Sequence, residues 1–93
     1  MDADSRTGNP EIVMYSQALC GYCAAARKLL KRKGVDYTEI NVTMSAARRR
    51  EMFDRSGRRT APQIFIGDRH IGGYDDMAEL DRHNELDTLL GTT

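Results

Sequence analysis

The sequence predicts a three-layer α/β domain built around a four-stranded mixed sheet. Segments with strand and helix character follow one another in the order β-α-β-α-β-β-α. The first strand, helix and second strand form a βαβ unit, which requires a parallel pair and a right-handed crossover. The last two strands are separated by a tight Gly-Asp turn, which indicates an antiparallel hairpin and therefore a mixed sheet.

The βαβ unit occupies the first half of the chain. Residues 11–16, EIVMYS, are rich in β-branched and aromatic side chains and predict a buried strand. After Cys20 the run AAARKLLKRK consists of strong helix formers, and Gly34 is expected to end that helix. Residues 35–42, VDYTEINV, alternate apolar and polar side chains, which is the period of a half-buried strand.

A helix, a hairpin and a last helix follow. Ser45 is the expected N-cap of the helix SAARRREMFDRS, which the next glycine should stop. Residues 63–67, QIFIG, and 69–73, RHIGG, predict the two short strands of the hairpin. A final amphipathic helix begins near Asp75, and Asn84 is expected to break it in two.

The length of 93 residues is that of one small domain. Residues 1–10, MDADSRTGNP, offer almost nothing to bury, so we expect a disordered tail there and a folded domain over residues 11–93. The tail has no apolar core of a signal sequence, and no stretch approaches the roughly 20 apolar residues of a membrane span. These observations predict a cytoplasmic protein without membrane contact.

Charges are balanced in number but not in position. Fourteen Lys and Arg against fourteen Asp and Glu give a formal net charge of zero, which argues against a nucleic-acid binder. Basic residues concentrate between residues 27 and 59, and acidic residues between 75 and 87. Most of these charges are expected to be solvated, but a groove between the two regions would suit a small zwitterionic ligand.

The two cysteines, Cys20 and Cys23, stand two residues apart in LCGYC and allow several interpretations. A purely structural disulfide is disfavoured, because closing so short a loop constrains the unfolded chain only slightly. Cys-x-x-Cys is also half of a zinc site, but His70 and His83 lack the spacing to complete it and are better explained as surface or packed residues. A further interpretation is that the two cysteines only pack as small apolar side chains. It is disfavoured, because such cysteines would not need to lie at a strand-to-helix junction.

A redox pair explains the position of both sulfurs. Cys20 falls at the start of the predicted helix, where unpaired N–H groups and the macrodipole stabilise a thiolate. Cys23 shares the inward face with Ala26 and Leu30, so it is shielded and can attack Cys20 in a second step.

Two further segments predict a binding slot beside the cysteines. In Thr60-Ala61-Pro62 the proline invites a cis bond, which would leave the backbone of Ala61 free to pair with an extended peptide. Residues 72–76, GGYDD, form a Gly-rich turn that opens a helix, a nest for a carboxylate with acidic side chains for an ammonium group. Taken alone, GGYDD would be explained by turn glycines and acids that suit the helix dipole. The two segments together describe a slot for a short ligand with both charges.

Three motifs together resemble the glutaredoxin family, specifically its short bacterial dithiol type. CGYC, SGRRTAPQIFIG and HIGGYDD stand in the family's order and spacing, and the likeness runs from about residue 11 to residue 90. The resemblance implies a thioredoxin-like fold, and glutathione as cofactor and reductant. It also implies that Cys20 is the nucleophile, that Cys23 is the resolving thiol and that Pro62 is in cis.

The resemblance also implies which residues of this chain bind glutathione. Ala61 would pair its backbone with the cysteine of glutathione. The γ-glutamyl end would meet backbone N–H groups and a carboxylate at Tyr74, Asp75 and Asp76. Arg49 would hold the glycine carboxylate, and Tyr22 would line the groove. The full set of expected glutathione-binding residues is Gln17, Tyr22, Arg49, Thr60, Ala61, Pro62, Gly73, Tyr74, Asp75 and Asp76.

One departure from the family concerns charge near the nucleophile. Many members have a lysine three residues before the nucleophile, where this chain has Gln17. A cation that could help both the thiolate and the glycine carboxylate is therefore absent there. Arg49, Arg58 or Arg59 could compensate for it.

Another departure concerns the active-site turn. Gly21 stands where the commoner motif has proline, and Tyr74 stands where short bacterial forms often have a further cysteine. Family members without that proline include some that bind a [2Fe-2S] cluster between two chains and two glutathione thiolates. The competing hypothesis is therefore a cluster carrier or sensor that dimerises through the cluster, with Cys20 as a cluster ligand.

The resemblance and the residues together predict a monomeric glutathione-dependent thiol–disulfide oxidoreductase. The Cys20 thiolate would attack a glutathionylated thiol or a protein disulfide, and a second glutathione or Cys23 would release the reduced product. Its partners would be glutathione and disulfide-containing or glutathionylated proteins, among which the family suggests ribonucleotide reductase. A thioredoxin with its own reductase is disfavoured, because such a protein has little need for the GGYDD and Arg49 elements.

Overall fold

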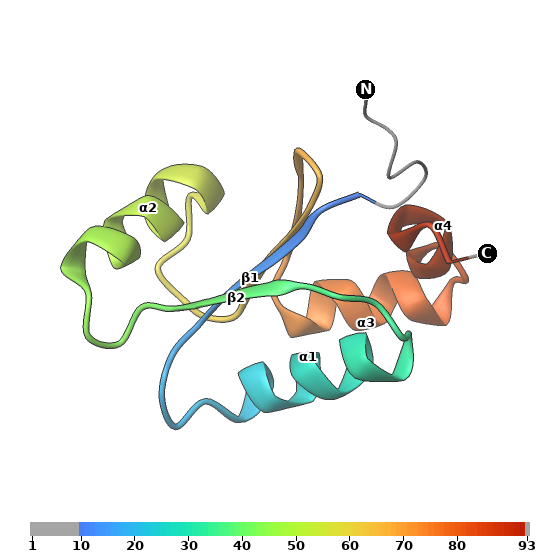
Figure 1. Ribbon diagram of the computed structural model, residues 1–93, viewed down its shortest axis with the longest axis horizontal. Coiled ribbons are helices and arrows are strands. Elements are labelled where there is room, and N and C mark those ends of the chain that lie inside the picture. Colours follow the sequence, from blue (N-terminus) through green and yellow to red (C-terminus); the bar gives the residue numbers. More distant parts are fainter. Residues whose placement is uncertain (1–9, 93) are drawn as a thin grey trace.

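The computed structural model describes residues 10–92 and confirms the predicted order of elements, with the last helix in two pieces (Figure 1). The elements are β1 (Ile12–Ser16), α1 (Gly21–Arg32), β2 (Thr38–Asn41), α2 (Ala46–Ser56), β3 (Gln63–Ile66), β4 (Arg69–Gly72), α3 (Tyr74–Arg82) and α4 (Leu86–Leu90). The tail predicted for residues 1–10 lies, except for Pro10, outside the described residues. No helix within residues 10–92 is long and apolar enough to cross a membrane.

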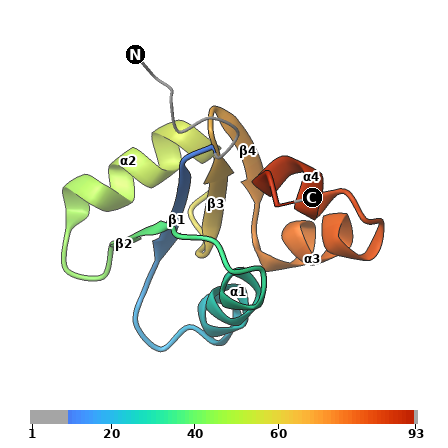
Figure 2. The same cartoon turned by 45° about the vertical axis from the view of Figure 1, so that its right-hand side comes forward.

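The sheet is mixed, as predicted, with the strand order β2-β1-β3-β4. Strands β1 and β2 are parallel, as a βαβ unit requires, and β1–β3 and β3–β4 are antiparallel. Helix α2 lies on one side of the sheet, and α1, α3 and α4 lie on the other (Figure 2). The sheet is therefore the middle of three layers.

Alternation along the central strands gives the sheet two buried faces. Met14 and Ile64 are fully buried against the layer of α1, α3 and α4. Their neighbours in sequence, Tyr15 and Phe65, point to the opposite face and pack with Met52 of α2. This is the period of two that a strand imposes on its side chains.

A buried polar contact fixes α2 to the sheet. The hydroxyl of Tyr15 donates to the carboxylate of Glu51 and accepts from Nη1 of Arg55 at 2.9 Å. The guanidinium of Arg55 also lies 4.1 Å from the centre of the Phe65 ring. Burial raises the pKa of the Tyr15 phenol, so this hydroxyl keeps its proton at neutral pH. The contact adds to the packing of Met52, the buried residue of α2.

The second strand is shorter than the sequence predicts. The whole range 35–42 was expected to be strand, whereas β2 begins at Thr38. The reason lies in the end of α1: Gly34 has a left-handed φ of 71°, and the N–H of Val35 turns back to the carbonyl of Leu30 at 3.5 Å. Val35 therefore completes the helix cap and packs on the core instead of pairing with β1.

The other predicted element ends lie at, or within one residue of, those in the structure. Ser45 caps α2, and Gly57 stops it with a φ of 74°. The last helix breaks as expected, because Asn84 takes a left-handed φ of 61° between α3 and α4. The helix begins at Tyr74, one residue before the predicted Asp75.

We predict that Ser45→Ala lowers the free energy of unfolding by about 1 kcal/mol, within a range of roughly 0.5–2 kcal/mol. The Ser45 hydroxyl accepts the Arg48 N–H at 3.1 Å, and alanine leaves that donor without its acceptor. Urea unfolding would measure the loss. Ser45→Asn is the matched control, since it keeps a side-chain acceptor, and equal losses in the two variants would contradict the capping role.

Candidate active site

The sulfur of Cys20 sits at the first turn of α1. Cys20 is the N-cap of this helix, and the N–H of Cys23 donates to its sulfur at 3.1 Å. The first turn of α1 contains no acidic residue. Backbone N–H groups and the helix dipole therefore favour negative charge on this sulfur, with no neighbouring carboxylate of that turn to oppose it.

The two cysteines differ in access. Cys20 is partly exposed, whereas Cys23 has no exposed surface and packs under the helix, as do Ala26 and Leu30. This confirms the inward face that the sequence predicts for Cys23. The two residues are joined by a disulfide bond, with their Cα atoms 5.2 Å apart. An incoming thiol or disulfide thus reaches the sulfur of Cys20 first.

The loop before β3 brings the backbone of Ala61 close to the sulfur of Cys20. The Ala61–Pro62 peptide bond is cis, as predicted. The carbonyl oxygen of Ala61 lies 3.7 Å from the sulfur of Cys20. Residues 20 and 61 are far apart in the sequence, and β1 and β3 are neighbours in the sheet, so the antiparallel pairing of these strands brings them together.

A buried amide holds this loop in place. Gln63 is 1% exposed, and its Nε2 donates to the carbonyl and hydroxyl oxygens of Thr60 at 2.8 and 3.3 Å. Its Oε1 lies 2.8 Å from Nε2 of His70, whose ring packs on Phe65. Burial, then the charge of Arg58, lowers the pKa of His70, so the imidazole is neutral at pH 7. The sequence predicts a packed or surface His70 but not its bond to Gln63.

The start of α3 carries a carboxylate with two fixed donors. Oδ2 of Asp76 accepts the N–H of Gly73 at 2.9 Å and Nη1 of Arg58 at 3.0 Å. The Gly73 N–H and then the Arg58 guanidinium hold the pKa of the Asp76 carboxyl below its usual range. Gly72 has a φ of 118°, and a Cβ there would collide with the Asp76 carboxyl group. The first glycine of GGYDD is thus required by the placement of Asp76.

These elements enclose a cleft of about 320 Å³ beside Cys20. The cleft contains eight of the ten residues predicted to bind the ligand. Its lining consists of Tyr22, Arg58, Thr60, Ala61, Pro62, Gln63, Gly73, Tyr74, Asp75 and Asp76. The rings of Tyr22 and Tyr74 stack at a centroid distance of 6.3 Å and connect the starts of α1 and α3. The cleft thus combines an aromatic wall, a free backbone edge, two carboxylates and a guanidinium.

Two of the predicted binding residues, Gln17 and Arg49, do not line the cleft. Nη1 of Arg49 donates to the carbonyls of Val42 and Thr43 at 3.0 and 2.9 Å, so this guanidinium fixes the loop before α2. The cation that does line the cleft is Arg58, which the sequence suggests only as a substitute for a missing lysine. Its pairing with Asp76 joins residues 18 positions apart, which no local pattern reveals.

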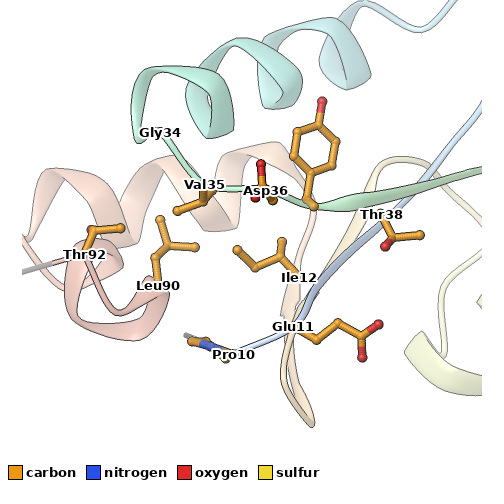
Figure 3. Close-up of a pocket in the computed structure, with 10 residues that line it drawn as sticks. Pro10, Glu11, Ile12, Gly34, Val35, Asp36, Thr38, Leu90 and Thr92 are labelled. Atoms are coloured by element: carbon orange, nitrogen blue, oxygen red, sulfur yellow. The ribbon is translucent and has the colours of Figure 1, made fainter. Parts of the chain in front are cut away.

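A second hollow lies at the other end of β1 and α1 (Figure 3). Its volume is about 480 Å³, and Ile12, Val35 and Leu90 are among its lining residues. Neither cysteine lines it. It therefore has no part in the chemistry of the thiols.

The sequence and the fold of this chain both match those of known proteins from one family. The glutaredoxin family model matches residues 12–71. Glutaredoxin 3 of Escherichia coli K12 is 48% identical over 79 residues, which cover 85% of this chain and 95% of that protein. The solution structure of glutaredoxin from Brucella melitensis has a TM-score of 0.81 and 45% identity, with 91% of this chain and 92% of that one covered. The crystal structure of the buckwheat glutaredoxin–glutathione complex has a TM-score of 0.79 and 33% identity, covering 87% of this chain and 76% of that one. The α/β arrangement is the thioredoxin-like fold of these neighbours.

We predict that the Asp76 carboxyl titrates below the ordinary aspartate value of about 3.9, measured by carbon-detected NMR. Arg58→Met should raise this pKa only in part, because the Gly73 N–H, the larger cause, remains. Since the pKa is lowered on folding, Asp76 stabilises the fold above its unfolded pKa, and that contribution is lost as the pH falls through the folded pKa. Arg58→Lys, which keeps the charge, is the control. An unchanged Asp76 pKa in Arg58→Met would refute the assigned pairing.

Proposed function

The chain belongs to the glutaredoxin family of glutathione-dependent thiol–disulfide oxidoreductases, and we propose that it reduces protein disulfides and glutathione mixed disulfides through Cys20 and Cys23. One observation carries the proposal: a partly exposed sulfur at a helix N-terminus lies 3.7 Å from the Ala61 carbonyl at a cleft with both charges. The sulfur supplies the nucleophile. The cleft supplies the place for the reductant.

Glutathione fits the chemistry of the cleft from end to end. Its cysteine would pair with the backbone of Ala61, which brings the glutathione sulfur next to Cys20. Its γ-glutamyl carboxylate would meet the unpaired N–H groups that begin α3, and its ammonium would meet Asp76. The buckwheat relative solved with glutathione supports this choice of ligand. Tyr22 and Tyr74 would form one wall of the slot.

The charged residues of the cleft would contact opposite ends of the glutathione tripeptide. The ammonium group of glutathione would share or replace the Arg58 contact at Asp76, which frees Arg58 for a carboxylate. The roles of Arg49 at the glycine carboxylate and of Gln17 remain predictions, because neither residue lines the cleft.

The first half-reaction is an attack by the Cys20 thiolate. With a glutathionylated protein, Cys20 attacks the glutathione sulfur, a Cys20–glutathione disulfide forms, and the protein leaves as a thiolate that takes up a proton. A second glutathione thiolate then attacks the glutathione sulfur of this intermediate. Glutathione disulfide leaves, and Cys20 returns as the thiolate. In net terms, one glutathione thiol is oxidised to the disulfide level and one protein thiol is restored.

A protein disulfide follows the dithiol route. Cys20 attacks one of its sulfurs, forms a mixed disulfide with the protein and releases the protein's other thiol. Cys23 then attacks the sulfur of Cys20, so the second protein thiol leaves and the Cys20–Cys23 disulfide forms. The bonded pair in the structure corresponds to this oxidised state. Two glutathione molecules reduce it and return the enzyme to the dithiol.

The proposed partners are glutathione and disulfide-containing or glutathionylated proteins. Ribonucleotide reductase remains a suggestion at the level of the family. A reductase that draws electrons from glutathione needs a compartment with a reduced glutathione pool, so we place it in the cytoplasm.

Cys20→Ser should abolish turnover of the mixed disulfide of glutathione and 2-mercaptoethanol, because no thiolate remains at the helix start. Cys23→Ser should keep much of this activity, since the glutathione route does not use the buried thiol. A coupled assay with glutathione reductase and NADPH measures both. On a protein disulfide the Cys23→Ser enzyme should lose most of its rate. Equal losses of the two variants on the small substrate would reject the assigned roles.

A [2Fe-2S] carrier or sensor is the second candidate. A Cβ at Gly21, the residue after Cys20, would meet no heavy atom within 4 Å apart from its chain neighbours and its own helix backbone, so there is open space at this position of the turn. Within residues 10–92, however, no group of three His, Cys, Asp or Glu side chains could hold a metal ion. Cys20 would be the chain's single cluster ligand, and the cluster would fit only if glutathione and a second copy of the chain supplied the other thiolates.

Absorption separates the two candidates. We expect anaerobically purified protein to be colourless, monomeric and fully active, as the reductase requires. A brown preparation with visible absorption and the elution volume of a dimer would favour the carrier. Cys20→Ser is the control, because it removes the one ligand and must also remove any colour. Measuring the activity of metal-free and cluster-reconstituted protein side by side decides which form works.

A further inference from the structure

Three large apolar side chains of the described chain are mostly exposed: two lie within two residues of Cys20, and the third lies in a loop that is hydrogen-bonded to the segment before Cys20. Leu19 is 105% exposed, Met44 is 93% exposed and Tyr22 is 63% exposed. Leu19 directly precedes Cys20, and Met44 lies in the loop between β2 and α2. Single exposed apolar residues are ordinary on a protein surface, but their concentration at one place is informative. Tyr22 already belongs to the cleft, which leaves Leu19 and Met44 without a role.

A hydrogen bond joins the loop of Leu19 to the loop of Met44. The N–H of Ala18, next to Leu19, donates to Oγ1 of Thr43, next to Met44, at 2.7 Å. The N–H of Thr43 in turn donates to Oδ1 of Asn41 at 2.9 Å. The two loops extend from β1 and β2, which are neighbours in the sheet (Figure 1).

Both loops are also fixed in shape. Arg49 holds the carbonyls of Val42 and Thr43, so the segment before Met44 is anchored to α2. Leu19 has a left-handed φ of 54°, a conformation that is uncommon for a residue with a large side chain. The structure thus holds a leucine in an unfavourable backbone conformation with its side chain entirely in solvent. Observed strain of this kind tends to occur at functional sites.

We propose that Leu19 and Met44 form a docking surface for protein substrates, an inference that rests on the proposed reductase function. The occupant would be an apolar side chain next to the disulfide or glutathionylated cysteine of the substrate. The surface adjoins Cys20 but is not part of the glutathione cleft, whose lining includes neither residue. The protein substrate and glutathione would therefore contact different residues around the Cys20 sulfur.

Positive charge at the start of α2 indicates which residues the protein substrate should carry. Helix α2 begins two residues after Met44 with Ala-Ala-Arg-Arg-Arg, and its first turn has no acidic residue. The side chains of Arg48 and Arg50 are 51% and 78% exposed. Arg48 and Arg50 pair with Glu51 and Asp54, whereas Arg49 binds backbone carbonyls, so its charge leaves this end of the helix positive. A substrate segment with acidic residues beside its apolar one would complement this surface.

The test compares a protein-like substrate with a small one. The variant Leu19→Asn/Met44→Gln removes both apolar side chains, and asparagine also accepts the left-handed backbone. The substrates are a glutathionylated peptide with Leu and Glu around its cysteine, the same peptide with Ser and Lys, and the mixed disulfide of glutathione and 2-mercaptoethanol. We expect kcat/KM for the Leu/Glu peptide to fall about tenfold, with the small disulfide unchanged. The wild type should also prefer the Leu/Glu peptide over the Ser/Lys peptide.

The matched control is Leu19→Met/Met44→Leu, which keeps the surface apolar and should retain wild-type kcat/KM on the Leu/Glu peptide. Unchanged activity of the polar variant on that peptide would overturn the docking surface, and so would an equal loss on the small disulfide. A wild-type chain that reduces none of the three substrates would instead overturn the proposed function, and the docking surface with it. The activity on the small disulfide therefore tells the two failures apart.

Discussion

The N–H of Cys23 and the sulfur of Cys20 form the contact on which the rest of the site depends. A helix must begin with unpaired N–H groups, and here one of them points at a sulfur instead of at a hydroxyl or carboxylate cap. The contact exists because β1 ends four residues before Cys20 and α1 starts directly after it. The βαβ topology then places this helix start at one edge of the sheet. The cis-proline loop reaches the same edge because β3 runs antiparallel to β1.

A second constraint comes from the close approach of backbone and carboxylate at the start of α3. Asp76 folds back onto the Gly73 N–H, and this is possible only because Gly72 has no Cβ. A Cβ on Gly73 would also lie 3.4 Å from the carbonyl oxygen of Pro62, so this turn is packed against the cis-proline loop. The two segments that we propose to bind different parts of glutathione are thus held against each other before the ligand arrives. Such preorganisation lowers the ordering cost of binding.

Predictions from the sequence were best where a local pattern decides the outcome. The N-cap at Ser45, the break at Asn84 and the inward face of Cys23 all follow from spacing or from single-residue propensity. The short β2 was missed because Val35 fits the alternating pattern of a strand equally well when it packs over the cap of α1.

Side-chain contacts between elements that are far apart in the sequence could not be predicted from local sequence patterns. The bonds of Gln63 to His70 and of Arg58 to Asp76 depend on where the hairpin and α3 meet, and Arg49 turns to the loop of Thr43. An arginine has several backbone and side-chain acceptors within reach, and only the folded arrangement selects one of them.

The cap at Cys20 also determines how the mixed disulfide breaks down. Exchange is faster when the departing thiolate is stable, so the helix start that makes Cys20 a nucleophile also makes it a good leaving group. In the proposed mechanism, a second glutathione that attacks from the cleft would expel Cys20 in this way. Cys23, which is buried beneath the turn, would attack the Cys20 sulfur itself and so expel the substrate toward solvent. In the proposed mechanism, a mixed disulfide on Cys20 is therefore open to attack from the cleft and from the buried thiol, so one exposed sulfur would support both routes.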